Sequence, residues 1–155
     1  MFYLLGLAVS LTCFVSVILM LGGSLLNFVD PSSFFMIIVP LAAILFATGS
    51  FKTFGGGLMA AVLPNKPIPE ELRGQAASLF RFLSKVTAML MGIMTIIGFM
   101  NILLNLDLSD PNAINAIGMS ISSTLISSFY GLILIAVVFE PVVFILKKRH
   151  EPKRK

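Results

Sequence analysis

Aliphatic hydroxyls crowd one apolar part of the chain, the segment SSTLISSFYG at residues 122–131. If this part is helical, a stripe of small residues follows one face of it: Ser120, Ser123, Ser127 and Gly131. Ser128 flanks that stripe. Hydroxyls are hard oxygen ligands that can replace part of the hydration shell of an alkali ion. They do not titrate near neutral pH, so proton movement past them needs a carboxylate or a chain of water molecules.

The same hydroxyls have a second interpretation, in which they serve only to pack helices. Small polar residues let membrane helices approach one another closely. Their hydroxyls also bond the backbone carbonyl four residues earlier in the same helix. The residue pattern by itself leaves both interpretations open.

Glu140 is the one carboxylate inside an apolar stretch, and an acid within a membrane is a functional candidate by default. It lies two turns before the basic run at 147–149, so pairing or snorkelling toward that run is an equally open interpretation. Pro141 follows it, and a proline within a helix frees the carbonyl four residues earlier, here that of Val137, and allows a kink. Together these residues predict a polar exit near one membrane boundary.

No other chemistry is indicated by the sequence. It contains no Ser/His/Asp set, no phosphate-binding motif and no cluster of metal ligands, and the glycines at 55–57 lack a following Lys. The single Cys13 lies in an apolar run, and His150 lies in a basic tail. We therefore predict that the chain is not an enzyme and that it holds no cofactor and no metal site, apart from a transported ion.

The elements that position these residues are predicted to be membrane helices. The 155-residue chain is 57% hydrophobic and 12% charged, with a mean hydropathy of +1.01, whereas soluble domains contain about 25% charged residues. Four apolar stretches are long enough, at ~1.5 Å per residue, to cross a hydrocarbon core of ~30 Å. They are residues 2–21, 34–51, 86–104 and 117–146. We predict an all-α integral membrane protein with four transmembrane helices.

The basic residues indicate how these spans are oriented. All eleven Lys and Arg lie in residues 52–85 or in the tail at 147–155. Because Lys and Arg are enriched in cytoplasmic loops, we predict that both segments and both termini are cytoplasmic, within one membrane domain over residues 1–155. The net charge of +4 does not gather into a nucleic-acid-binding patch, so no nucleic-acid partner is expected.

The predicted cytoplasmic loop at 52–85 has two parts. The first, TFGGGLMAAVLPNKP at 53–67, is rich in Gly and Pro and predicts a break in helical structure. In the second, Pro69 suits the first position of a helix, and Glu70 and Glu71 suit its first turn. Apolar residues at helical spacing follow, so we predict a short amphipathic helix that runs into the third span.

Four stretches, in order along all four predicted spans, resemble the MotA family of flagellar stator subunits, within the wider MotA/TolQ/ExbB group. They are GGSLLNFVDPSSFFMIIV (22–39), GIMTIIGFMNILLNL (92–106), SDPNAINAIGMSISSTLISSFYG (109–131) and FEPVV (139–143). The resemblance implies a homo-oligomeric ring, understood as a pentamer, around a MotB- or ExbD-like partner whose single membrane helix carries an Asp. In such motors, passage of Na⁺ or H⁺ across the bacterial inner membrane drives rotation of the ring.

The resemblance also implies roles for individual residues. By matching position, Thr95 and Ser128 lie beside the ion site and Pro141 is the proline of the fourth span, while Ser127 and Glu140 complete the predicted ion pathway. Sodium-using members tend to have Thr at both hydroxyl positions. Here Thr95 keeps that pattern and Ser128 departs from it, so Na⁺ is favoured and H⁺ stays open. Five positions are expected to pack helices or ring neighbours: Gly92, Gly98, Gly118, Tyr130 and Gly131.

The sequence departs from this family in three places. Ala88 stands at the proline position of the third span, Pro40 lies near the place of a second Gly pair in span two, and the loop at 52–85 replaces a much larger cytoplasmic domain. That domain bears the charges that push on the rotor, so an ion-driven rotary motor subunit is a better interpretation than a flagellar stator. Four charged residues are the predicted contact with a rotor or another cytoplasmic load: Glu70, Glu71, Arg73 and Arg81.

Two further hypotheses stay open. A small stand-alone four-helix transporter typically needs its own membrane-embedded acid, usually in the first span, and residues 2–21 contain none. A non-conducting membrane scaffold would use its hydroxyls for packing alone. A neighbouring reading frame that encodes a single-span protein with one membrane Asp would favour the motor over both.

Overall fold

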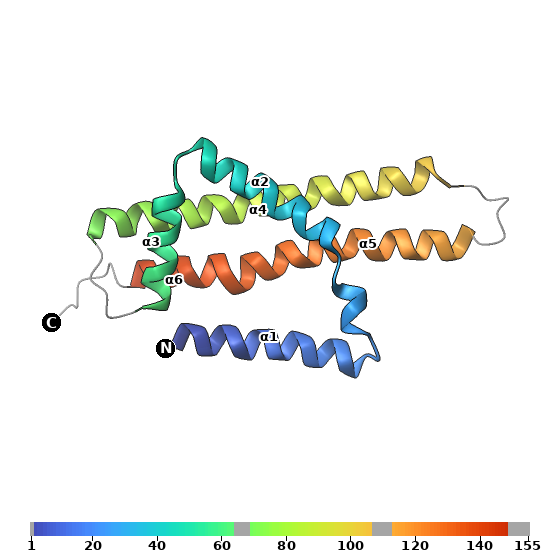
Figure 1. The fold of residues 1–155 in the computed structure, drawn as a ribbon, viewed down its shortest axis with the longest axis horizontal. Coiled ribbons are helices and arrows are strands. Elements are labelled where there is room, and N and C mark those ends of the chain that lie inside the picture. The colour runs from blue at the N-terminus through green and yellow to red at the C-terminus, as the bar shows by residue number, and fades with distance from the viewer. Residues whose placement is uncertain (1, 64–68, 107–112, 149–155) are drawn as a thin grey trace.

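The computed structural model describes residues 2–63, 69–106 and 113–148, and every regular element in these ranges is helical. The elements are α1 (Phe2–Met20), the 3₁₀ turn η1 (Leu25–Phe28), α2 (Pro31–Ala47), α3 (Phe51–Val62), α4 (Glu70–Leu104), α5 (Ala113–Ile133), the π-helical segment η2 (Leu134–Phe139) and α6 (Glu140–Lys148) (Figure 1). Four helical stretches are long and apolar enough to cross a membrane. The predicted all-α fold with four spans is therefore confirmed.

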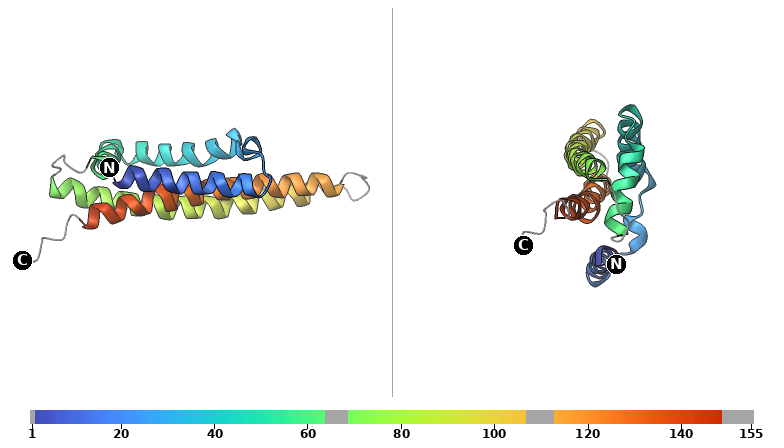
Figure 2. Two further views of the ribbon diagram at one scale, coloured as in Figure 1. Left: turned by 90° about the horizontal axis from the view of Figure 1, so that it is seen from below. Right: turned by 90° about the vertical axis from the view of Figure 1, so that its left-hand side faces the viewer.

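Two long antiparallel stretches, α4 and the continuous α5–η2–α6, lie side by side along the length of the molecule (Figures 1 and 2). Helix α4 has 35 residues, which at ~1.5 Å per residue amounts to ~52 Å. Helix α2 packs on one side of this pair, and α1 lies beside α5 and η2, where the Phe14 ring meets that of Phe129, with most of its residues exposed. The predicted amphipathic helix is thus continuous with the third span, as one helix from Glu70 to Leu104.

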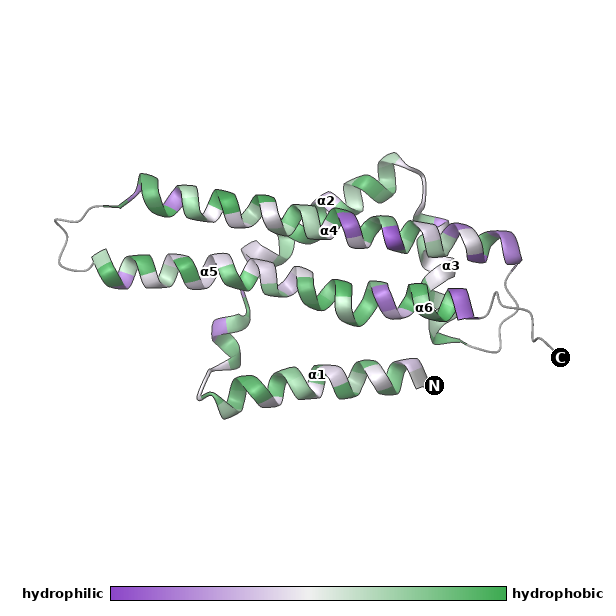
Figure 3. Cartoon of the chain, turned by 180° about the vertical axis from the view of Figure 1, so that it is seen from behind, coloured by the Kyte–Doolittle hydropathy of each residue, from purple (hydrophilic) through white to green (hydrophobic). Residues whose placement is uncertain are grey.

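Polar residues gather at one end of the molecule, formed by α3, the start of α4 and the end of α6 (Figure 3). We call it the basic end, because five exposed cations lie there: Lys52, Arg81, Lys85, Lys147 and Lys148. Elsewhere the spans are apolar on most sides, as expected of helices whose solvent is lipid. The prediction that this end and both termini face the cytoplasm stays a prediction.

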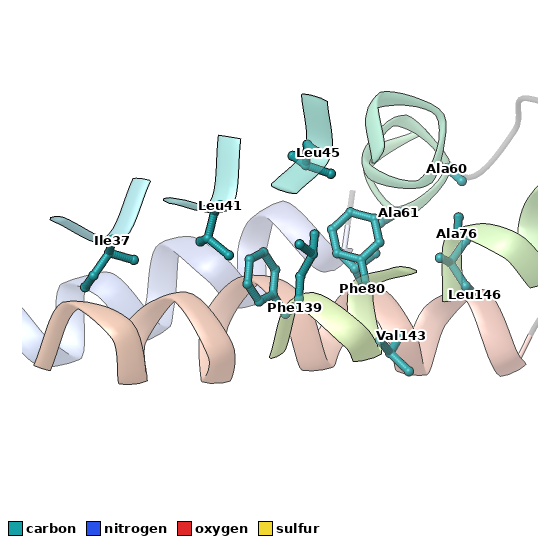
Figure 4. Close-up of a cluster of buried hydrophobic side chains, with 12 residues drawn as sticks. Ile37, Leu41, Leu45, Ala60, Ala61, Ala76, Phe80, Phe139, Val143 and Leu146 are labelled. Atoms are coloured by element: carbon teal, nitrogen blue, oxygen red, sulfur yellow. The ribbon is translucent and has the colours of Figure 1, made fainter. Parts of the chain in front are cut away.

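The hydrophobic core lies toward the basic end, where α2, α3, α4 and α6 meet (Figure 4). Phe80 and Val142 are fully buried, and Leu83 and Leu146 are 1% exposed. The ring of Phe80 stacks on that of Phe54 in α3, with centroids 5.0 Å apart. This core holds the ends of α4 and α6 together and fixes the register of the two long stretches.

Helix α3 corrects the prediction of a break over residues 53–67, because Phe51–Val62 is helical through all three glycines. Each Gly costs a helix about 1 kcal/mol relative to Ala, and tertiary packing offsets that cost here. A Cβ at Gly57 would lie 2.7 Å from the Phe80 ring and 2.9 Å from the Cβ of Ala76, so a larger residue could not lie in this crossing. The sequence showed the glycines, but it did not show that they pack against α4.

The boundaries of α2 and α4 also differ from prediction. Helix α2 begins at Pro31 and ends at Ala47, rather than covering 34–51, because the Asp30 side chain caps its start and Gly49, at φ +60°, turns the chain after its end. Pro69 is the N-cap of α4 and not its first helical residue. The two ends of α2 are thus set by local cap and turn chemistry.

Candidate functional site

Helices α4 and α5 approach closely at two glycines. A Cβ on Gly98 would overlap the side chain of Thr124, and a Cβ on Gly131 would overlap that of Met91. Small residues at such positions let two membrane helices pack closely. The close approach brings hydroxyls on α4 within reach of hydroxyls on α5.

Thr95 and Ser128 meet in this interface. Their hydroxyl oxygens are 2.8 Å apart, and Thr95 also donates to the carbonyl of Met91 at 2.9 Å. A hydroxyl has one proton and two lone pairs. With its proton on Met91, Thr95 accepts from Ser128, which leaves one lone pair on Thr95 and two on Ser128. Both residues are partly exposed, so these lone pairs are available to a ligand from outside the chain.

A second set of polar contacts begins at the neighbouring Ser127. Its hydroxyl lies 2.5 Å from that of Ser33 in α2, and Ser33 donates to the Asp30 carboxylate at 2.5 Å. Ser33 has one proton, so Ser127 donates to Ser33, and the Ser123 carbonyl, 3.3 Å from the Ser127 hydroxyl, is its more distant alternative acceptor. Ser33 is 2% exposed and Ser127 is 9% exposed, so this path is sheltered. It links the start of α2 to the helix turn that carries Ser128.

Tyr130 also connects α5 to the turn before α2. Its hydroxyl donates to the carbonyl of Phe28 and accepts from the backbone N–H of Asp30 at 3.2 Å. The turn between α1 and α2 is therefore tied to the last turn of α5 and not to its start. The far halves of α4 and α5 extend past this turn, as Figure 1 shows.

The stripe of small residues on α5 opens into a cavity of about 520 Å³ between α2, α4 and α5. The stripe members Ser120, Ser123 and Ser127 line it, together with Ser33 and Asn101. The cavity gives these hydroxyls a common space, with an otherwise mostly apolar lining, that reaches from the far half of the α4–α5 pair to the Ser33–Ser127 contact.

Glu140 lies at the basic end, where its carboxylate accepts a hydrogen bond from Ser84 at 2.7 Å. A pocket of about 460 Å³ holds Glu140 together with Arg81, Ser84 and Lys85. Glu140 is exposed, while Ser84 is 6% exposed. The position of Glu140, two helical turns before Lys147 and in one pocket with Arg81 and Lys85, thus agrees with both the pairing and the exit interpretation.

Pro141 is accommodated by the π-helical segment Leu134–Phe139 rather than by a simple kink. The Glu140 N–H bonds the carbonyl of Ile135, five residues earlier. The carbonyl of Ala136 then has no backbone donor, because its next donor would be Pro141, which has no N–H. The proline therefore frees a carbonyl on the α1 side of the helix, one residue from the predicted Val137.

The other predicted positions are spread along the molecule. Nothing lies within 4 Å of a Cβ built on Gly92 or Gly118, so these two glycines do not pack against this chain's own helices. Four charged residues lie in the first three turns of α4, away from the hydroxyl pair: Glu70, Glu71, Arg73 and Arg81. Glu71 accepts a hydrogen bond of 3.5 Å from Gln75.

Sequence reasoning missed three contributors, Asp30, Ser33 and Ser84. The Asp-Pro-Ser-Ser stretch at 30–33 carries a helix-cap signal, since an Asp before Pro accepts from the following backbone N–H. The contact between Ser33 and Ser127 joins positions 94 residues apart, and no local pattern reports it.

The MotA/TolQ/ExbB proton channel family has a sequence model that matches residues 56–154. The chain belongs to this family. The match covers more than half of the chain, including most of α3 and all of α4, α5 and α6, and so it includes Thr95, Ser128, Glu140 and Pro141. A search of curated proteins found no significant match. The family and the four apolar stretches together identify a multi-pass membrane protein with a channel-type function.

Proposed function

We propose that this chain is a ring-forming subunit of an ion-driven rotary motor of the bacterial inner membrane, which couples Na⁺ or H⁺ flux to torque. The observation that carries the proposal is the contact of 2.8 Å between Thr95 and Ser128 at the α4–α5 interface. Two hydroxyls with free lone pairs are suitable ligands for part of an alkali ion's shell. Neither hydroxyl is bonded to a carboxylate of the described residues.

The missing charge comes from a partner. A cation that leaves water needs a negative group near its oxygen ligands, and a proton needs a group that titrates. We assign this role to an Asp on the single membrane helix of a MotB- or ExbD-like protein, against which the α4–α5 interface packs. Thr95 and Ser128 are then half of a site that two chains complete.

Some apolar surfaces of the chain are not covered by its own helices, and they support a homo-oligomer. We propose that it contains five copies. The far half of α4 exposes Ile96, Ile97, Met100 and Leu103, each by 50% or more. Gly118 opens onto a mostly apolar cavity of about 1310 Å³ between α5 and the turn before α2. Apolar faces and small residues of this kind are what packing membrane helices bury. Ring neighbours and the partner helix cover them in our proposal.

The start of α4 is the proposed site of contact with a rotor or another cytoplasmic load. Glu70, Glu71 and Arg81 are exposed there, and Arg73 is half-buried among them. Because α4 is one continuous helix, these charges are rigidly connected to Thr95, so an ion-driven movement at the hydroxyl pair is transmitted along a single element.

The proposal is tested by reconstituting the chain in vesicles with and without a single-span protein that carries one membrane Asp. We expect sodium- or proton-dependent flux with both chains and none with either alone. Flux should also be lost when the partner's membrane Asp is changed to Asn. Flux through the chain alone would support a stand-alone transporter instead, and no flux under any condition would support a scaffold.

A further inference from the structure

Helix α3 has a direction unlike that of the four spans. It runs across the ends of α4 and α6 at the basic end, roughly perpendicular to them (Figures 1 and 2). Its inner face is built from Gly57, Ala60 and Ala61, which are buried against the core that contains Phe80 and Leu146. The helix is therefore firmly seated and is not a loose connection.

The outer face of α3 is apolar. Phe51, Gly55 and Met59 recur every four residues along the helix, and the C-cap residue Leu63 follows them; we call these residues the stripe. Phe51 is 50% exposed, Met59 is 54% exposed and Leu63 is 48% exposed. Lys52 adds one exposed cation beside the stripe. The small residues of α3 pack against protein, while its bulky apolar residues point outward. We therefore infer that an apolar environment outside the chain covers the outer face.

The position of α3 along the long axis of the molecule indicates what this environment is. Its buried face contacts the core at Phe80 and Leu146, and the residues that follow these two are the cations Arg81, Lys147 and Lys148. Helix α2 has 17 residues, or ~26 Å, and ends four residues before α3 begins. That length nearly crosses a hydrocarbon core of ~30 Å, so α3 begins where the core ends and the headgroups start.

We propose that α3 is an interfacial helix that lies in the membrane surface at the basic end, with its stripe of Phe51, Met59 and Leu63 inserted at the boundary of headgroups and acyl chains. The partner is a phospholipid surface with anionic headgroups, whose phosphates neutralise Lys52 and the nearby cations Arg81, Lys147 and Lys148. Because α3 is locked onto α4 and α6, its insertion fixes the depth at which these helices sit, and with it the depth of the ion site.

The sequence contains no tryptophan, so a single introduced Trp reports on one place in the membrane. Met59→Trp places it on the stripe. Gln75→Trp, on an exposed polar position of α4, is the aqueous reference, and Leu11→Trp, in the middle of α1, is the deep reference. Each full-length variant is reconstituted in vesicles of zwitterionic and anionic phospholipid and is exposed to iodide or to lipids brominated at a chosen depth.

We expect Met59→Trp to emit at a shorter wavelength than Gln75→Trp. It should be quenched several-fold more by lipids brominated near the headgroup end of the acyl chain than by lipids brominated deep in it, with the reverse order for Leu11→Trp. Strong quenching by iodide alone would overturn the proposal, because the stripe would then face water. Resistance to both quenchers would also overturn it, because a neighbouring subunit would then cover the stripe. Phe51→Trp repeats the test on the same stripe if Met59→Trp does not fold.

Discussion

Helix α1 and the α4–α5 interface contain the same kinds of side chain and use them differently. In α1, Ser10, Thr12 and Ser16 each donate to the carbonyl four residues earlier, at 2.8 to 2.9 Å. Between α4 and α5, Thr95 makes such a bond and also meets Ser128 across the interface. A hydroxyl that is satisfied within its own helix is compatible with lipid contact. A hydroxyl that contacts another helix makes a polar site between the two helices.

The same division runs through SSTLISSFYG itself. Ser122 and Thr124 donate to carbonyls of their own helix, those of Gly118 and Ser120. Ser127 and Ser128 reach out to Ser33 on α2 and Thr95 on α4. Position relative to neighbouring helices, and not residue type, separates packing hydroxyls from candidate ligands.

The largest expected effect concerns the glycines that bring α4 and α5 together. Gly98→Leu would overlap Thr124, and Gly131→Leu would overlap Met91. Overpacking of a fitted interface costs about 1–3 kcal/mol or more, so we expect a large loss of folded protein, measured by size-exclusion chromatography in detergent.

Gly92→Leu and Gly118→Leu are the matched controls, because both positions are open within the chain. They should keep the yield of folded protein, and the same chromatograms report whether the oligomer survives. Equal yields from all four variants would contradict the account of the α4–α5 interface.

Replacement of Glu140 is expected to have the next largest effect. Glu140→Gln keeps an oxygen that can accept from Ser84, so folding should be preserved. If the carboxylate receives the ion at the basic end, turnover in vesicles should fall several-fold. Turnover equal to wild type would show that Glu140 only pairs at the membrane boundary.

Ser33 is expected to have a smaller effect, on stability. Ser33→Ala removes the link between Asp30 and Ser127 and leaves a buried hydroxyl without that partner. Such a loss costs about 1–2 kcal/mol, and it should lower the thermal unfolding midpoint of the purified protein. Ser16→Ala on α1 is the control, with an expected change within about 0.5 kcal/mol. If the two variants unfold at the same temperature, hydroxyls bonded between helices stabilise the protein no more than hydroxyls bonded within α1, and the distinction fails.

Composition and apolar length were enough to predict the four spans, and helical periodicity predicted the continuity of α4 with its amphipathic start. These features depend on local sequence and on the membrane as solvent. The helix at 51–62 was not predicted, because the partner that makes Gly57 favourable is Phe80, in another helix. The start of α2 was predicted three residues late, because the cap at Asp30 was not recognised.

The candidate site was predictable only in part, for the same reason. The pattern of hydroxyls could not separate Ser122 from Ser128, since both lie in one stretch and face neighbours that the sequence does not name. The family resemblance selected Thr95 and Ser128, and the structure places their hydroxyls in contact. The network from Asp30 through Ser33 to Ser127 depends on a contact between α2 and α5 and could not be read from either segment alone.

The most direct test of the central claim compares two double variants in vesicles that contain the chain and its partner. Thr95→Val with Ser128→Ala removes the hydroxyls that meet across helices, and Thr12→Val with Ser16→Ala removes two that are satisfied within α1. We predict that the first variant assembles normally but loses sodium-dependent flux, while the second keeps it. Unchanged sodium-dependent flux in the first variant would contradict the assignment of Thr95 and Ser128 to the ion site.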